Sequence, residues 1–215
     1  GGHFNPVVTL ACMLRGHCSI IRGIFYWAAQ FGGGCAGAGI LRAIFGNLAF
    51  LGTTIPTSSN GKAVGLEIML TFIFLVVILT VSERQSVADR LRYDNSVGTK
   101  ISEETRALVA AIIIGFIFGA VQSFGWNLSG SSVNPWRSFC PALVSGGSKA
   151  ALRSIWVYFL GPICGSILAV IYRYLCYGVD VTLGVQKVSW QTMKGHFHPF
   201  SRKSSMEVPL QQPGQ

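Results

Sequence analysis

Four long apolar segments restrict the folds that this sequence can adopt. They cover residues 20–45, 63–81, 107–126 and 155–176, and each is close to or above the roughly 20 residues that a helix needs to cross a bilayer. Only 12% of the residues are charged, whereas soluble domains carry about 25%. We therefore expect an all-α, multi-pass membrane protein with four full spans in a lipid bilayer.

The remaining composition does not indicate a nucleic-acid partner, a cofactor or an enzyme. The net charge is +9, but the cations lie between the apolar segments and near the C-terminus, without a basic stripe of interleaved aromatic residues. The six cysteines include no CxxC pair, so we expect neither a structural disulfide nor a metal site. The sequence also contains no recognisable catalytic constellation.

Two shorter apolar runs each begin with an Asn-Pro step. As helices, each would be about 14 Å long, roughly half of a 30 Å hydrocarbon core. Asn5 and Asn134 are good N-caps. Pro6 and Pro135 suit the first helical position, because the missing N–H would have no helical partner there. The sequence therefore predicts two half-helices, over residues 6–14 and 135–143.

The half-helices belong to an internal repeat. Each is followed by a full span with two glycines four residues apart, Gly33/Gly37 in the first and Gly161/Gly165 in the second. Small residues at this spacing allow close helix packing in lipid. When the spans alternate, most lysines and arginines fall on one side, which predicts that this side is cytoplasmic. The half-helices then start on opposite sides, so the repeat is inverted.

With these features the sequence resembles the aquaporin, or major intrinsic protein, family. The segments that carry the resemblance are GGHFNPVVTLA, AQFGGGCAGAGIL, GLEIMLTF, SGSSVNPWRSFCPAL and VYFLGPICGSILA, in the family's order. The resemblance implies an aquaporin-like inverted-repeat bundle over residues 1–177. Relative to the family's six spans, the chain begins at the first pore loop, so the first two spans are expected to be missing. Residues 178–215 are expected to form a disordered cytoplasmic tail.

Asn5, Asn134 and Arg137 are expected to shape a pore. The N–H groups that open the half-helices carry the positive end of the helix dipole, and such paired ends are already known to exclude protons and cations in aquaporins. Arg137 must face a wet cavity, because a charge in lipid costs at least about 2.5 kcal/mol. The resemblance implies that it is the selectivity-filter arginine. Alternatively, the two Asn are ordinary N-caps and Arg137 caps loop carbonyls.

Glu67 and His3 are further candidates. Glu67 lies within an apolar span, and the resemblance implies that its carboxylate supports the pore loops, together with Pro6 and Pro135. Proton transfer is a weaker interpretation, because no second ionisable residue completes a relay along the span. His3 either lines the inner mouth of the pore or packs within its loop.

The resemblance also assigns positions to Gln122 and Ser131. Gln122 stands where water-selective members carry a filter histidine, so the filter would be less positive. Ser131 stands where some members carry a mercury-sensitive cysteine, so no mercurial block through residue 131 is expected. Ser138 replaces the aspartate that is usual in glycerol-conducting relatives, which favours a water-type channel.

The third residue of each Asn-Pro motif differs from the family's usual alanine. It is Val7 in the first motif and Trp136 in the second. Overpacking by a side chain as large as Trp136 typically costs about 1–3 kcal/mol. It could separate the half-helices, narrow the pore or point into lipid.

The sequence therefore predicts a passive water channel. One alternative is a channel for glycerol or other small neutral solutes, or a leaky ion path. Another is a non-conducting membrane protein in adhesion or assembly, which the missing spans favour because four spans would not close the pore wall. The resemblance implies a homotetramer, which we expect in the plasma membrane.

Overall fold

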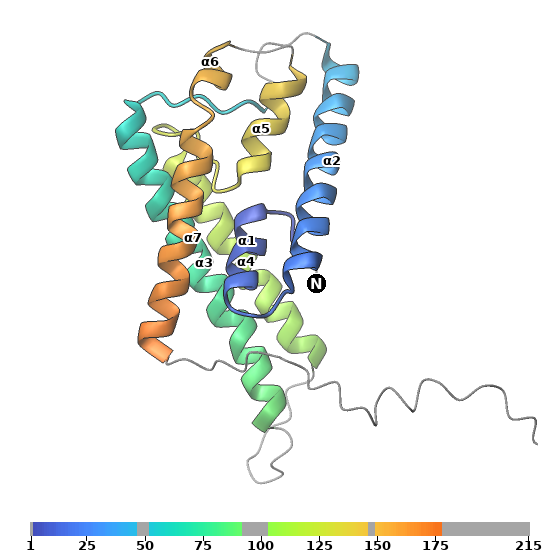
Figure 1. The fold of residues 1–215 in the computed structure, drawn as a ribbon, viewed down its shortest axis with the longest axis vertical. Helices are drawn as coiled ribbons and strands as arrows, with labels where there is room; N and C mark the ends of the chain where they lie inside the picture. The colour runs from blue at the N-terminus through green and yellow to red at the C-terminus, as the bar shows by residue number, and fades with distance from the viewer. Residues whose placement is uncertain (1, 47–51, 92–102, 146–148, 178–215) are drawn as a thin grey trace, which may run out of the picture. The chain divides into compact units, whose positions relative to one another are not determined.

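The computed structural model describes residues 2–46, 52–91, 103–145 and 149–177, which are helical apart from loops and turns (Figure 1). The tail predicted over residues 178–215 lies outside the described residues. In chain order the helices are α1 Pro6–Leu14, α2 Ile20–Phe45, α3 Asn60–Leu91, α4 Glu103–Gly125, α5 Pro135–Val144, α6 Lys149–Arg153 and α7 Val157–Tyr177.

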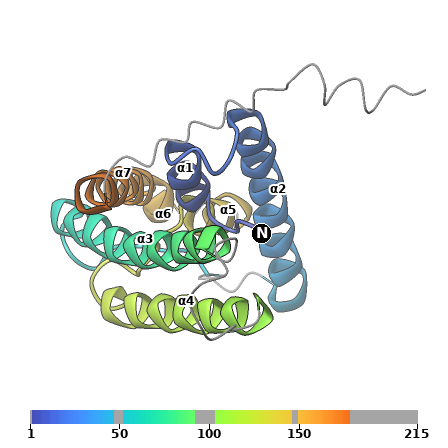
Figure 2. The ribbon, with the colours of Figure 1, turned by 90° about the horizontal axis from the view of Figure 1, so that it is seen from below.

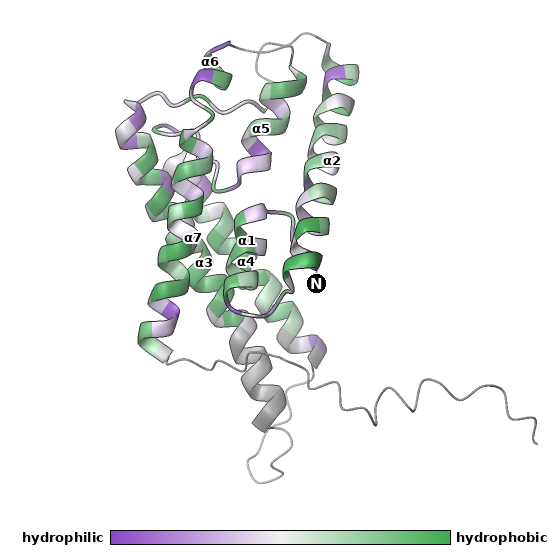
Figure 3. Ribbon diagram, viewed as in Figure 1, coloured by the Kyte–Doolittle hydropathy of each residue, from purple (hydrophilic) through white to green (hydrophobic). Residues whose placement is uncertain are grey.

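Three of the described helices are long and apolar enough to cross a membrane. Their membrane-compatible segments are Asn60–Ser82, Ala107–Gly125 and Val157–Cys176. The fourth predicted span, α2, is helical over the predicted residues. Its composition is not apolar enough, however, for it to count among the described helices that could cross a membrane. Its glycines and Gln30 dilute its apolar residues, as the pale central turns of α2 in Figure 3 show.

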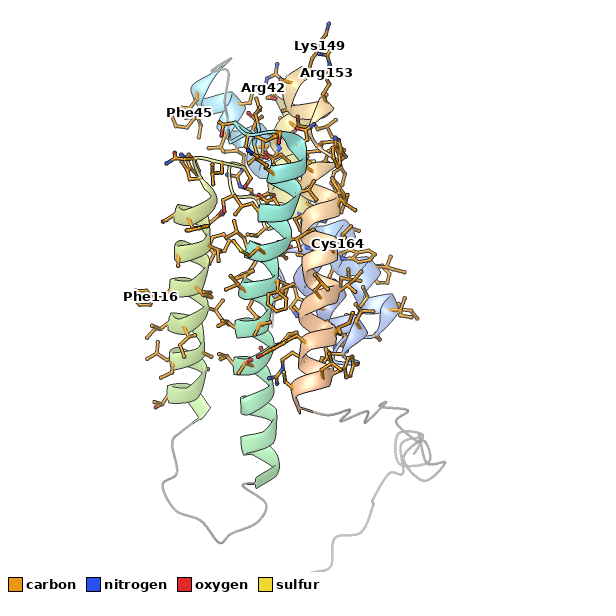
Figure 4. The ribbon with its side chains drawn as sticks, turned by 90° about the vertical axis from the view of Figure 1, so that its left-hand side faces the viewer. Arg42, Phe45, Phe116, Lys149, Arg153 and Cys164 are labelled. Carbon is orange, nitrogen blue, oxygen red and sulfur yellow. The ribbon has the colours of Figure 1, made fainter. Side chains whose placement is uncertain are left out.

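The outer surface of the bundle is apolar, as a membrane protein requires. Phe116 is 78% exposed and points away from the bundle on α4 (Figure 4). Arg42, Lys149 and Arg153 lie together at one end of the same bundle (Figure 4).

The two predicted half-helices, α1 and α5, are present and begin at the predicted residues. The Asn5 side chain accepts a hydrogen bond from the Val7 N–H at 3.1 Å. The Asn134 side chain accepts from the N–H groups of Trp136 at 3.1 Å and Arg137 at 3.4 Å. Both Asn residues are therefore N-caps, because their side-chain oxygens bind N–H groups that have no partner within the helix.

The two half-helices run in opposite directions from the middle of the bundle, with their N-termini facing each other (Figure 1). Both pack against α2, and both also contact α7. Helix α3 packs along α7, and α4 packs along α3, as the end-on view in Figure 2 shows. This arrangement holds the two N-termini between the long helices.

Glycines allow α7 to approach α3 closely. A Cβ atom at Gly161 would lie 2.5 Å from the Glu67 Cβ, and one at Gly165 would lie 2.5 Å from the Ile68 carbonyl oxygen. For the matching pair on α2, Gly33 and Gly37, no atom of the described residues lies within 4 Å of the added Cβ. The second repeat thus uses its glycine pair for packing, whereas the first leaves its pair uncovered.

We expect Gly165→Ala to lower the free energy of unfolding by about 1–3 kcal/mol, because the new methyl group would collide with the α3 backbone. Gly37→Ala is the matched control, since it adds the same methyl group to a helix where no atom lies nearby. Unfolding in detergent micelles, followed by circular dichroism, would measure both. Equal effects of the two variants would contradict the packing described above.

Candidate site at the junction of the half-helices

Each capping asparagine also binds the loop of the other half-helix. Asn5 Nδ2 donates to the Val133 carbonyl at 2.7 Å, and Asn134 Nδ2 donates to the Phe4 carbonyl at 3.0 Å. Each acceptor immediately precedes the other asparagine, so the two motifs are linked by a symmetric pair of crossed hydrogen bonds. Because an amide nitrogen carries two N–H groups, each asparagine keeps one further donor.

Glu67 binds the loop that leads into α5. Its carboxylate is fully buried on α3 and accepts from the Ser129 hydroxyl at 2.7 Å and from the N–H groups of Ser132 and Val133, each at 2.8 Å. The Tyr158 hydroxyl on α7 donates to the Ser129 carbonyl at 2.5 Å. Glu67 and Tyr158 thus provide hydrogen-bond partners for N–H, hydroxyl and carbonyl groups of this loop. Such groups need partners within the protein because water is absent from the bilayer core.

These contacts hold an unusual backbone. Ser131 and Val133 have φ angles of 45° and 46°, a region that non-glycine residues rarely occupy and that costs of order 1–3 kcal/mol. The Ser131 N–H donates to the Ser129 hydroxyl at 3.1 Å, while Glu67 binds the Val133 N–H. The carboxylate therefore fixes a loop conformation that the sequence of the loop alone would not favour.

Arg137 is anchored beside the junction. Its Nη1 donates to the Gly52 carbonyl at 2.7 Å, in the segment between α2 and α3. It interacts electrostatically with the Glu67 carboxylate, and it also lines an open cavity. The two interpretations of Arg137, capping a loop carbonyl and facing a cavity, are thus compatible.

The open cavity has a volume of about 750 Å³. The N-terminal loop, α2, Gly52 and the first two turns of α5 contribute its lining. The polar side chains on its wall include those of His3, Gln30, Asn134 and Arg137. His3 also packs edge-on against Tyr26 at 5.1 Å between ring centroids, so it both lines the cavity and packs within its loop.

Gln122 and Ser131 lie elsewhere. Ser131 is fully buried, and its hydroxyl donates to the Val121 carbonyl at 2.9 Å. Gln122 follows Val121 on α4 and is half-buried. The structure thus brings these two positions near each other, but neither lines the cavity that Asn134 and Arg137 share.

Trp136 packs into an aromatic cluster and does not separate the half-helices. Its ring centroid lies 5.2 Å from that of Phe31 on α2, 6.2 Å from Phe139 and 5.7 Å from Phe159 on α7. The crossed asparagine bonds remain intact beside it. Trp136 therefore does not force the two motifs apart, because its ring packs against aromatic side chains of α2 and α7.

The first motif is held by residues that the sequence did not single out. Trp27 Nε1 donates to the Pro6 carbonyl at 3.0 Å, and Gln30 Nε2 donates to the His3 carbonyl at 2.5 Å. The Ser166 hydroxyl on α7 donates to the Val7 carbonyl at 3.0 Å. The Glu67 carboxylate accepts from N–H groups of the second loop, whereas here side-chain donors bind carbonyls of the first loop and of the first turn of α1.

The described residues contain no group of three or more His, Cys, Asp and Glu side chains that could hold a metal ion. The site consists instead of half-helix N-termini, amide and guanidinium donors, and a buried carboxylate that supports them. Such an arrangement can bind small polar molecules through hydrogen bonds.

Apolar helices and two opposed half-helices with paired asparagine caps define a multi-pass helical membrane protein that is built on an inverted repeat. The major intrinsic protein family pattern matches residues 1–173, and the chain belongs to this family.

Relatives named as aquaporins match most of the chain. Aquaporin NIP2-1 of Zea mays is 34% identical over 78% of this chain and 49% of its own length. Aquaporin-2 of Bos taurus is 36% identical over 82% of the chain and 59% of its own length. Aquaporin TIP2-3 of Arabidopsis thaliana is 36% identical over 86% and 64%, respectively. The chain thus spans between about half and two thirds of these relatives.

We expect Glu67→Gln to lower the free energy of unfolding by about 2–3 kcal/mol. The amide keeps the shape of the side chain but replaces one accepting oxygen with a donor, which leaves a buried loop donor without a partner. Glu104→Gln, at an exposed position on α4, is the matched control. Chemical unfolding in micelles, with hydrogen exchange at residues 129–134, would check this. Unchanged exchange in that loop would contradict the assignment.

Proposed function

We propose that the protein is a passive channel through which water crosses the membrane down its osmotic gradient. The observation that carries the proposal is the head-to-head meeting of two half-helix N-termini beside the cavity that Asn134 and Arg137 line. Each capping asparagine keeps one N–H that the caps and crossed bonds do not use. These donors offer successive hydrogen bonds to water oxygen atoms.

The same arrangement would exclude protons and cations. The two helix dipoles present their positive ends to the junction, an effect already known for aquaporin half-helices. Arg137 adds a full positive charge on the cavity wall. Among the described residues that line the cavity none is acidic, and the Glu67 carboxylate, which interacts with Arg137, is buried in its contacts with the loop.

Water is preferred over glycerol in this proposal. Ser138, which replaces the aspartate of glycerol-conducting relatives, is fully buried, and its hydroxyl lies 2.6 Å from that of Ser132. The Ser138 hydroxyl thus makes its hydrogen bond to the loop and does not contact a solute. Pro6, Pro135 and Glu67 support the two motifs, while Gln122 and Ser131 act from the α4 side, outside the cavity that Asn134 and Arg137 line. The C-terminus is cytoplasmic, and the assembly is a homotetramer in the plasma membrane.

A second candidate is a non-conducting role in assembly or adhesion. The observation that favours it is the face of α2 at Gly33 and Gly37, which line the open cavity and meet no other described residue within 4 Å of an added Cβ. A pore wall that is open along one helix does not by itself confine water to a single file.

Osmotic swelling of liposomes that contain the 215-residue chain would separate these candidates. The channel proposal predicts water flow above that of empty liposomes, glycerol flow at the lipid background, and no proton leak. Water flow at the background level, with insertion of the protein verified, would contradict the channel and favour the second candidate.

Arg137→Ala tests the filter within the same assay. We expect it to increase proton or sodium leak several-fold, because the cavity wall loses its positive charge. Arg153→Ala, at an exposed position on α6, is the control for losing one cation and should not change the leak. A leak that is the same for both variants would contradict the role of Arg137.

A further inference from the structure

Two cysteines meet where α5 packs against α2. The Cys140 Sγ atom lies 3.5 Å from the Phe31 carbonyl oxygen, and only 2.8 Å from where a Cβ atom at Gly34 would lie. Phe31, Gly34 and Cys35 share one face of α2, since they are three and four residues apart. Cys140 therefore packs against the turn of α2 that contains Cys35, and the two thiols lie close enough to interact.

We propose that Cys35 and Cys140 form a binding site for one thiophilic divalent cation of the Hg²⁺ type. The cation would form two metal–sulfur bonds and displace one proton from each thiol. Both protons leave to solvent, no electron is transferred, and both cysteines are free thiols before binding. The proposal concerns metal binding and does not depend on whether the protein conducts water.

The charge balance of this site selects a divalent ion. Two thiolates and one divalent cation form a neutral complex, whereas a monovalent ion such as Cu⁺ would leave one negative charge. A net charge among apolar side chains is costly, and Cys140 is fully buried. The neutral complex is therefore the one that this environment tolerates best.

The number of ligands selects a soft ion that accepts two-coordinate geometry. Zinc prefers four ligands, and the described residues provide no group of three candidate ligands. Thiolates favour soft metals. With metal–thiolate bonds of about 2.3 Å, as for zinc, a linear bridge spans about 4.6 Å between sulfur atoms, a separation that suits neighbouring thiols without a disulfide.

An ion can reach the pair through the open cavity. Gly34 and Pro141, the residues adjacent in sequence to Cys35 and Cys140, both line it, and Cys35 is itself half-buried and not fully enclosed. The site is distinct from residue 131, which carries a serine. An occupied site would join α5 to α2 one turn beyond Arg137.

The test uses the full chain with its four other cysteines changed to alanine, so that only the pair remains. Mercuric chloride would be titrated into the purified protein, with free thiols counted by maleimide labelling and bound mercury measured after a glutathione wash. We expect one mercury per chain, protection of both thiols together, and retention after the wash. The cysteines to be replaced are Cys12, Cys18, Cys164 and Cys176.

Cys35→Ser and Cys140→Ser in this background supply the controls, with helix content checked by circular dichroism. Even outer-shell changes weaken metal sites about 10- to 100-fold, so loss of a ligand should weaken binding by more than about 100-fold. A chain that keeps only Cys176, an exposed thiol, shows the affinity of an isolated cysteine. Two mercury ions per chain, or binding by the pair no tighter than by Cys176, would overturn the proposal.

Discussion

The crossed hydrogen bonds of Asn5 and Asn134 hold together an arrangement that electrostatics alone would oppose. Two half-helices that meet head to head bring the positive ends of their dipoles together, and each end has N–H groups without helical partners. Each asparagine caps its own helix with its oxygen and binds the opposite loop with its nitrogen. A single side chain thus caps its own helix and binds a carbonyl in front of the other, which explains why an amide stands at both positions.

The two loops that carry these asparagines are supported by opposite chemistry. The second loop exposes N–H groups inward, and the buried Glu67 carboxylate accepts from them. The first loop and the first turn of α1 offer carbonyls, and the Trp27, Gln30 and Ser166 side chains donate to them. A carboxylate within an apolar span is costly unless it is fully bound, and here its hydrogen bonds also hold a strained backbone. The hydrogen bonds with the loop therefore offset the cost of burying the carboxylate.

Local signals in the sequence were sufficient to predict the half-helices and their caps. The Asn-Pro steps determine where α1 and α5 begin, because N-cap and first-turn preferences depend on neighbouring residues only. Glu67 could be recognised as significant because an acid in an apolar span is rare. The positions of Gln122, Ser131 and Trp136 could not be predicted, since they depend on how α4, α2 and α7 pack around the junction. The glycine pairs show the same limit. Both have the same spacing, but the pair on α7 packs against α3, whereas the pair on α2 meets no other described residue.

The central claim is that the crossed asparagine bonds hold the two motifs together, and Asn→Asp substitution tests it most directly. Aspartate keeps the capping oxygen but removes the crossing N–H donor. The free energies of unfolding of Asn5→Asp, Asn134→Asp and the double variant would be compared in micelles, with the exposed Asn127→Asp as control. We predict a loss of about 1–3 kcal/mol for each single variant, and a double variant that loses less than their sum because both bonds close one junction. Single variants as stable as the Asn127→Asp control would contradict the account.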